Sequence, residues 1–146
     1  MKVKDCMCHE VAYLTPESTI QDCAKLMCNK HVGCIPVCDK NKTIVGLVTD
    51  RDLILRSIAC DKDVKSTPIS DIMTYRVSCC GPDEEVEQIE KKMSDEQIRR
   101  LPVVDENNKI IGIVTLGDLC ANQNIDTEGV CLTLESICSY NNKNAE

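Results

Sequence analysis

Hydrophobic residues follow a helical period in some segments of this chain and a strand-like pattern in others. Between Ser18 and Lys30 the apolar side chains lie three or four residues apart, which places them on one face of a helix. Ser18 is the expected N-cap, because its hydroxyl can accept a hydrogen bond from a backbone N–H of the first turn. The apolar face would consist of Ile20, Cys23, Ala24 and Met27.

Strands are predicted on both sides of this helix. An extended stretch from Val11 to Leu14 precedes it, and a short apolar strand near Ile35 to Cys38 follows it. After a polar turn, Thr43 to Thr49 is β-branched and nearly all apolar, which predicts a strand buried on both faces. A second helix is expected from Asp50 to about Ala59. The predicted order is strand, helix, strand, strand, helix.

The same pattern is written twice. Pro36 falls on Pro102, 66 residues later, and at this shift Ile44 to Thr49 falls on Ile110 to Thr115 without a gap. A register that holds over this length indicates an internal duplication. Residues Val130 to Ile137 form one further apolar segment that can dock on the body or on a partner, and 141–146 are expected to be disordered. The predicted parts are a first unit 1–60, a linker 61–68, a second unit 69–122 and a partly disordered tail 123–146.

Composition removes several classes of function. The chain has 24 acidic residues against 17 Lys and Arg, a net charge of −7, so a surface for nucleic acid is not expected. With three Tyr and no Phe or Trp, the core must be aliphatic and base stacking on aromatic rows is excluded. No apolar run is long enough for a membrane span, and Met1 to His9 resembles no signal peptide. We therefore expect a cytoplasmic protein.

The twelve cysteines suggest small buried hydrophobes in a reducing compartment rather than a disulfide framework. Cys6, Cys8 and His9 are the one cluster with a hint of metal-ligand spacing, but no second Cys pair follows, so no metal site is expected. Redox sensing by an exposed thiol remains an alternative. Several cysteines align with apolar residues of the other repeat: Cys6 with Ile72, Cys23 with Ile89 and Cys38 with Val104.

A threonine and an aspartate recur where each second strand meets the next helix: Thr49 with Asp52, and Thr115 with Asp118. One interpretation is a helix cap, with Thr as N-cap and Asp completing a capping box. The other is a ligand site, because a carboxylate in a first helical turn can accept two hydrogen bonds from a ribose diol and the backbone N–H groups there can bind an anion. The spacing alone leaves both open.

The repeats resemble the CBS domain family, named after cystathionine β-synthase, in the tandem arrangement called a Bateman module. The resemblance spans about Val3 to Asn122 and implies an α+β fold in which two units, each β-α-β-β-α, pack as a pseudo-twofold pair. The motifs that carry it are Cys34–Val37 and Arg100–Val103, the runs Gly46–Asp52 and Gly112–Asp118, and the opening Ile69–Thr74 of the second unit.

The resemblance implies regulation rather than catalysis. It implies that adenosine-containing ligands, such as AMP, ADP, ATP or S-adenosylmethionine, bind in clefts between the two units, that no cofactor is required, and that occupancy is passed to a protein effector. It also implies a homodimer. A protein-interaction module with degenerate sites is the alternative, and a thiol or metal sensor is a third hypothesis.

The ligand contacts should differ between the two sites. Arg51 precedes Asp52, whereas Gly117 precedes Asp118, and Arg100 stands before the second Leu-Pro step. Arg100 is the first choice for a phosphate contact and Arg51 the second, since a guanidinium can hold two oxygens at once; either can instead be a solvated surface residue. The Ile-Pro and Leu-Pro steps would offer an apolar wall and exposed backbone for adenine. The candidate ligand-binding residues are Ile35, Pro36, Thr49, Arg51 and Asp52, with Arg100, Leu101, Pro102, Thr115 and Asp118.

Overall fold

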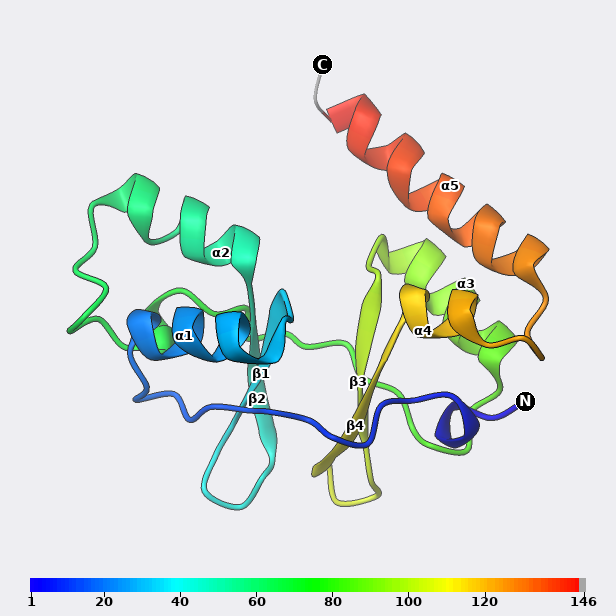
Figure 1. The fold of residues 1–146 in the computed structure, drawn as a ribbon, viewed down its shortest axis with the longest axis horizontal. Helices are drawn as coiled ribbons and strands as arrows, with labels where there is room; N and C mark the ends of the chain where they lie inside the picture. Colours follow the sequence, from blue (N-terminus) through cyan, green and yellow to red (C-terminus); the bar gives the residue numbers. More distant parts are fainter. Residues whose placement is uncertain (145–146) are drawn as a thin grey trace. The chain divides into compact units, whose positions relative to one another are not determined.

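A computed structural model describes residues 1–144, and within them the fold is α+β (Figure 1). In each repeat one longer helix is followed by a two-stranded sheet and then by one short helix. In the first repeat these are α1 (Ile20–Lys30), β1 (Cys34–Cys38), β2 (Ile44–Thr49) and α2 (Asp50–Leu55). In the second they are α3 (Val86–Glu96), β3 (Arg100–Val104), β4 (Ile110–Thr115) and α4 (Leu116–Ala121).

The remaining elements are three single 3-10 turns and one long helix. The helix α5 (Thr127–Asn144) fills most of the tail for which the sequence predicted one apolar segment and a disordered end. Residues 141–146 were predicted to be disordered: 141–144 instead belong to α5, and 145 and 146 lie outside the described residues. No helix among the described residues has the length and apolar character that crossing a bilayer requires. The 3-10 turns are η1 (Val3–Asp5), η2 (Ile58–Cys60) and η3 (Ile69–Asp71).

The first helix begins one residue later than the sequence suggested. Thr19, not Ser18, is the N-cap: its hydroxyl accepts the Asp22 N–H at 3.1 Å, and the Asp22 carboxylate accepts the Thr19 N–H at 3.0 Å. Both Ser18 and Thr19 have a suitable side chain three residues later, Gln21 and Asp22, and the structure uses the pair of Thr19 with Asp22. His31 ends the helix in the left-handed region, at φ 54°.

Three further expectations were wrong in detail. Val11 to Leu14 forms no strand and contributes a single bridge, between Leu14 and Val37. β2 alternates buried and half-buried residues instead of being buried on both faces, as expected for a hairpin with one face toward a core. The helix predicted from Asp50 to Ala59 ends at Leu55, after which the chain makes a 3-10 turn.

The two compact units of the structure interleave along the chain. The first-repeat unit comprises residues 12–77 and 107–110, and the second-repeat unit comprises 1–11, 78–106 and the described chain from 111 onward. The start of the chain therefore belongs to the second-repeat unit, where Cys8 exchanges backbone hydrogen bonds with Ile113 at 2.9 and 3.0 Å. The start of the second repeat belongs to the first-repeat unit, where Thr74 exchanges them with Leu47 at 2.9 and 3.0 Å.

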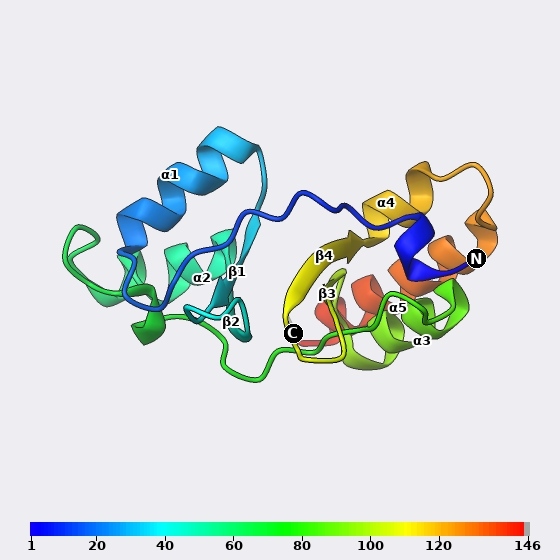
Figure 2. The same cartoon turned by 90° about the horizontal axis from the view of Figure 1, so that it is seen from below.

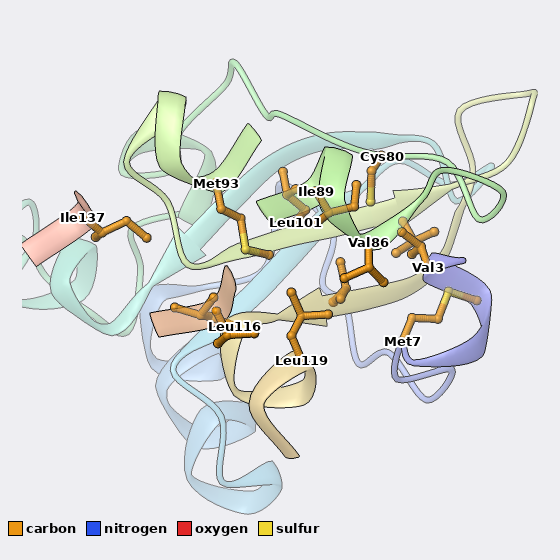
Figure 3. Packing of buried hydrophobic residues seen from close by; sticks show 13 residues of the cluster. Val3, Met7, Cys80, Val86, Ile89, Met93, Leu101, Leu116, Leu119 and Ile137 are labelled. Carbon is orange, nitrogen blue, oxygen red and sulfur yellow. The ribbon is translucent and has the colours of Figure 1, made fainter. Parts of the chain in front are cut away.

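Each unit has its own aliphatic core, as the shortage of aromatic residues predicted. The core of the first-repeat unit includes Ile20, Cys23, Met27, Ile35 and Val48. Figure 3 shows the core of the second-repeat unit, in which residues of η1 and of α5 meet those of α3 and β3. Both ribbon views place α5 alongside α3 within this unit (Figures 1 and 2). The apolar tail segment thus docks on the body.

A methionine covers a strand glycine in each unit. A side-chain carbon at Gly112 would lie 2.7 Å from Met7 Sδ and 3.0 Å from the Cys8 carbonyl oxygen. At Gly46 the nearest atoms are those of Met73. Both glycines have an ordinary φ, so their backbone conformation does not require glycine. The close approach of the methionine side chain does.

Replacing Gly112 with alanine should therefore destabilise the fold, because Met7 can shift but the Cys8 backbone is held by its hydrogen bonds to Ile113. Overpacking of this kind costs about 1–3 kcal/mol. The control is Gly117→Ala in α4, where the added carbon meets only Thr115 Oγ1 at 3.6 Å; this variant should gain up to about 1 kcal/mol in helix propensity. Urea unfolding measures both. Equal stability of the two variants would contradict the packing described.

Candidate functional site

The Thr–Asp pairs form capping boxes at the junctions of β2 with α2 and of β4 with α4. Asp52 Oδ2 accepts the Thr49 N–H at 2.9 Å, and Thr49 Oγ1 accepts the Asp52 N–H at 3.2 Å. In the second repeat the corresponding distances between Thr115 and Asp118 are 2.8 and 3.1 Å. The capping interpretation is therefore confirmed at both junctions. Ligand binding by the same residues stays a prediction.

The caps leave one carboxylate oxygen of each aspartate for another partner. Asp118 Oδ2 also accepts the Thr115 hydroxyl at 2.7 Å, so the cap uses only this oxygen. Among the described hydrogen bonds and ion pairs, none reaches Asp118 Oδ1. Asp52 Oδ1, in contrast, lies 3.6 Å from Nε of Arg56. Capping and ligand binding are thus compatible, and the two junctions are not equivalent.

The first-turn N–H groups are less open than the sequence suggested. The Arg51 N–H donates to Asp50 Oδ1 at 2.9 Å, and the Asp52 and Asp118 N–H groups donate to the capping hydroxyls. An anion at these helices would have to replace those bonds. The expectation of free backbone donors at these three residues was wrong, because the local side chains already satisfy them.

The Ile-Pro and Leu-Pro steps do not form an exposed wall. Ile35 and Leu101 are fully buried and belong to the cores of their units. The Pro36 carbonyl accepts the Leu14 N–H at 3.1 Å, and the Pro102 carbonyl accepts the Cys80 N–H at 3.0 Å. The predicted exposed backbone is therefore paired, and neither unit by itself supports an adenine contact at these residues.

The two candidate arginines lie at the same end of their hairpins as the caps. Arg51 is exposed in the first turn of α2, and Arg100 is half-buried at the start of β3. Cys34, which aligns with Arg100, is paired with Thr49 across the first hairpin. Their phosphate-binding roles stay predictions. Arg56 was not predicted as a site residue, although its position four residues after Asp52 on a helix indicates an ion pair with that aspartate.

The cysteines in the described part of the chain are thiols rather than disulfides, and Cys23 and Cys38 are fully buried, as their alignment with apolar residues predicted. Burial raises the pKa of Cys23 and of Cys80 to about 12, so both stay protonated thiols at neutral pH. No group of three His, Cys, Asp or Glu side chains within residues 1–144 is placed to hold a metal ion. Cys8 and Cys60 are among the exposed thiols, and redox sensing by an exposed thiol stays a prediction.

An open hollow of about 730 Å³ lies on the second-repeat unit, away from the Thr–Asp junction. Its rim carries the carboxylates of Asp83, Glu84, Asp105 and Glu106. Such a concentration of negative charge repels phosphate, so this hollow does not suit a nucleotide.

Comparison with known proteins decides the family. The sequence model of the CBS domain matches residues 3–58 and 69–123, one match for each repeat. The chain belongs to the CBS domain family. The CBS domain-containing protein YhcV of Bacillus subtilis is 44% identical over 121 residues, which cover 83% of this chain and 84% of YhcV.

Solved structures of CBS domain pairs have the same fold. The pair of protein MJ0100, in complex with 5-methylthioadenosine and S-adenosyl-L-methionine, matches with a TM-score of 0.73 and 30% identity, covering 81% of this chain and 95% of that one. CBSX2 in complex with AMP matches with a TM-score of 0.70 and 30% identity, covering 80% and 91%. This CBS domain protein is therefore similar to two proteins that bind adenosine-containing molecules.

Removing a capping hydroxyl should cost measurable stability. Thr115→Ala deletes the acceptor of the Asp118 N–H and the donor to Asp118 Oδ2, so we expect a loss of about 1 kcal/mol in the free energy of unfolding. Thr115→Ser keeps the hydroxyl and should retain most of it. Chemical unfolding followed by circular dichroism measures the difference. A Thr115→Ala protein as stable as the parent would show that the cap contributes nothing.

Proposed function

We propose that this CBS domain pair is a regulatory module that binds an adenosine-containing ligand at its Thr–Asp junctions and passes the occupancy to a protein effector. The observation that carries the proposal is Oδ1 of Asp118, which accepts no hydrogen bond from any described residue, at a junction in the fold that MJ0100 and CBSX2 share. In this proposal the module senses the ligand and does not change it chemically.

The chemistry of the junction suits a ribose. A carboxylate oxygen with free lone pairs can accept hydrogen bonds from the two adjacent hydroxyls of a ribose. An oxygen that is buried or already paired cannot accept them. The cap holds the Asp118 side chain by two hydrogen bonds, from the Thr115 N–H and the Thr115 hydroxyl to Oδ2, so little side-chain freedom is lost when the ligand binds. Arg100 and Arg51 are the proposed phosphate contacts at the two hairpins.

The proposed assembly is a homodimer formed through helices. Apolar side chains at the end of α2 and in η2 are exposed, with Ile54 at 56%, Leu55 at 47% and Ile58 at 66%. In the second-repeat unit the corresponding helix, α4, is packed against α5, as is α3. An uncovered apolar helical face of this kind favours burial against another copy of the chain or against the effector.

Ligand binding can be tested by thermal unfolding with AMP, ADP, ATP or S-adenosylmethionine. A bound ligand at 100 times its dissociation constant stabilises the folded protein by about 2.7 kcal/mol. We expect one or more of them to raise the melting temperature, and Asp118→Ala to reduce that rise because it removes the ribose acceptor. Asp95→Ala, which removes the same charge from an exposed pair with Lys91, is the control.

The alternative, an interaction module with empty sites, predicts a different result. In that case no adenosine compound changes the melting temperature of the parent protein at millimolar concentration. Such a result, with the protein folded, would reject the proposed function.

A further inference from the structure

The two junctions differ in one residue that lies outside the repeated motif. Arg56 follows Asp52 by four residues, and the aligned residue after Asp118 is Asn122. Arg56 Nε lies 3.6 Å from Asp52 Oδ1, the oxygen that the cap leaves over. In the first-repeat carboxylate, Oδ2 thus accepts the cap hydrogen bond and Oδ1 forms an ion pair with a guanidinium.

Arg56 is also fixed from a second side. Its Nη1 donates to the Ile72 carbonyl at 3.1 Å and to Thr74 Oγ1 at 3.4 Å. Ile72 and Thr74 belong to the start of the second repeat, which is built into the first-repeat unit beside β2. The guanidinium therefore bridges α2 and this segment, and moving it away from Asp52 means giving up two further hydrogen bonds.

Within residues 1–144, no ion pair like that of Arg56 reaches the second junction. The Asn122 side chain turns to the loop after α4, where its Oδ1 accepts the Asn124 N–H at 3.0 Å. Each aspartate lies near one thiol whose pKa is raised, first by burial: Cys6 for Asp118 and Cys23 for Asp52. Asp52 faces the Arg56 cation in addition.

We infer that Arg56 closes the Asp52 junction to ribose, so that the second-repeat junction is the stronger ligand site and the pair senses its ligand asymmetrically. The inference rests on the proposed function. At Asp52 Oδ1 a ribose hydroxyl must compete with the Arg56 guanidinium for a carboxylate whose side chain is only 14% exposed. At Asp118 Oδ1 no hydrogen bond or ion pair among the described residues competes with it.

The size of the difference is set by the exposure of Arg56. Its side chain is 52% exposed, so solvent screens the ion pair and the block is graded rather than absolute. We expect the first-repeat junction to bind up to about fivefold more weakly than the second.

Single-site proteins measure this difference directly. Asp52→Asn leaves the second-repeat junction, and Asp118→Asn leaves the first; AMP is titrated into each by calorimetry. We expect weaker binding by Asp118→Asn. Adding Arg56→Asn to Asp118→Asn should recover up to about fivefold in affinity. The reciprocal exchange, adding Asn122→Arg to Asp52→Asn, should weaken binding by a similar factor. Arg56→Gln, which can still donate to the Ile72 carbonyl, provides a second uncharged variant if Arg56→Asn lowers stability.

The outcomes separate this inference from the proposed function. If the parent protein binds neither AMP nor the other adenosine compounds, the proposed function fails. If the parent binds AMP but Asp52→Asn and Asp118→Asn bind it equally, and neither Arg56 variant changes the affinity, only the asymmetry is overturned. Weaker binding after removal of Arg56 from the first-repeat junction would also overturn it, since Arg56 would then be a ligand contact.

Discussion

Two hydrogen bonds between a threonine and an aspartate three residues later fix the end of each hairpin. They start the short helix, and they hold the carboxylate in one orientation with one oxygen committed to the backbone. A six-residue helix has little stability of its own, so the cap and the packing under it decide whether the helix forms. The same bonds make the aspartate a rigid acceptor whose second oxygen decides what the junction can bind. At Asp118 that oxygen is open, and at Asp52 it faces Arg56.

The interleaving of the two units explains why the duplicated halves form one protein. Each repeat supplies the opening segment that completes the hairpin of the other, and a methionine of that segment covers the strand glycine. Sequence comparison identified the duplicated segments because matching residues stand at a constant distance along the chain. It could not show that the two repeats exchange their opening segments, because the sequence does not indicate which glycine Met7 and Met73 each cover.

Helices and strands were predictable wherever a long apolar period or a Pro-Val step marked them. The errors have local causes: Ser18 and Thr19 are both good caps, and each has a capping-box side chain three residues later, so the local sequence does not decide between them. At the site, the Thr–Asp spacing predicted the residues correctly but left cap and ligand contact undecided, because both use the same geometry. Arg56 was missed because the aligned residue is Asn122 and the repeat pattern therefore gave it no weight. The burial of Ile35 and Leu101 depends on which segments cover the hairpins, which local sequence does not reveal.

The central claim is that the free oxygen of Asp118 is the primary acceptor for the ligand. Carbon-detected NMR of the aspartate side-chain carboxylates during a titration with AMP tests it most directly. We expect the Asp118 carboxyl resonance to shift at the lowest AMP concentrations, and the Asp52 carboxyl resonance to shift only at several-fold higher AMP concentration. AMP binding that shifts neither carboxyl resonance, or shifts that of Asp52 first, would contradict it.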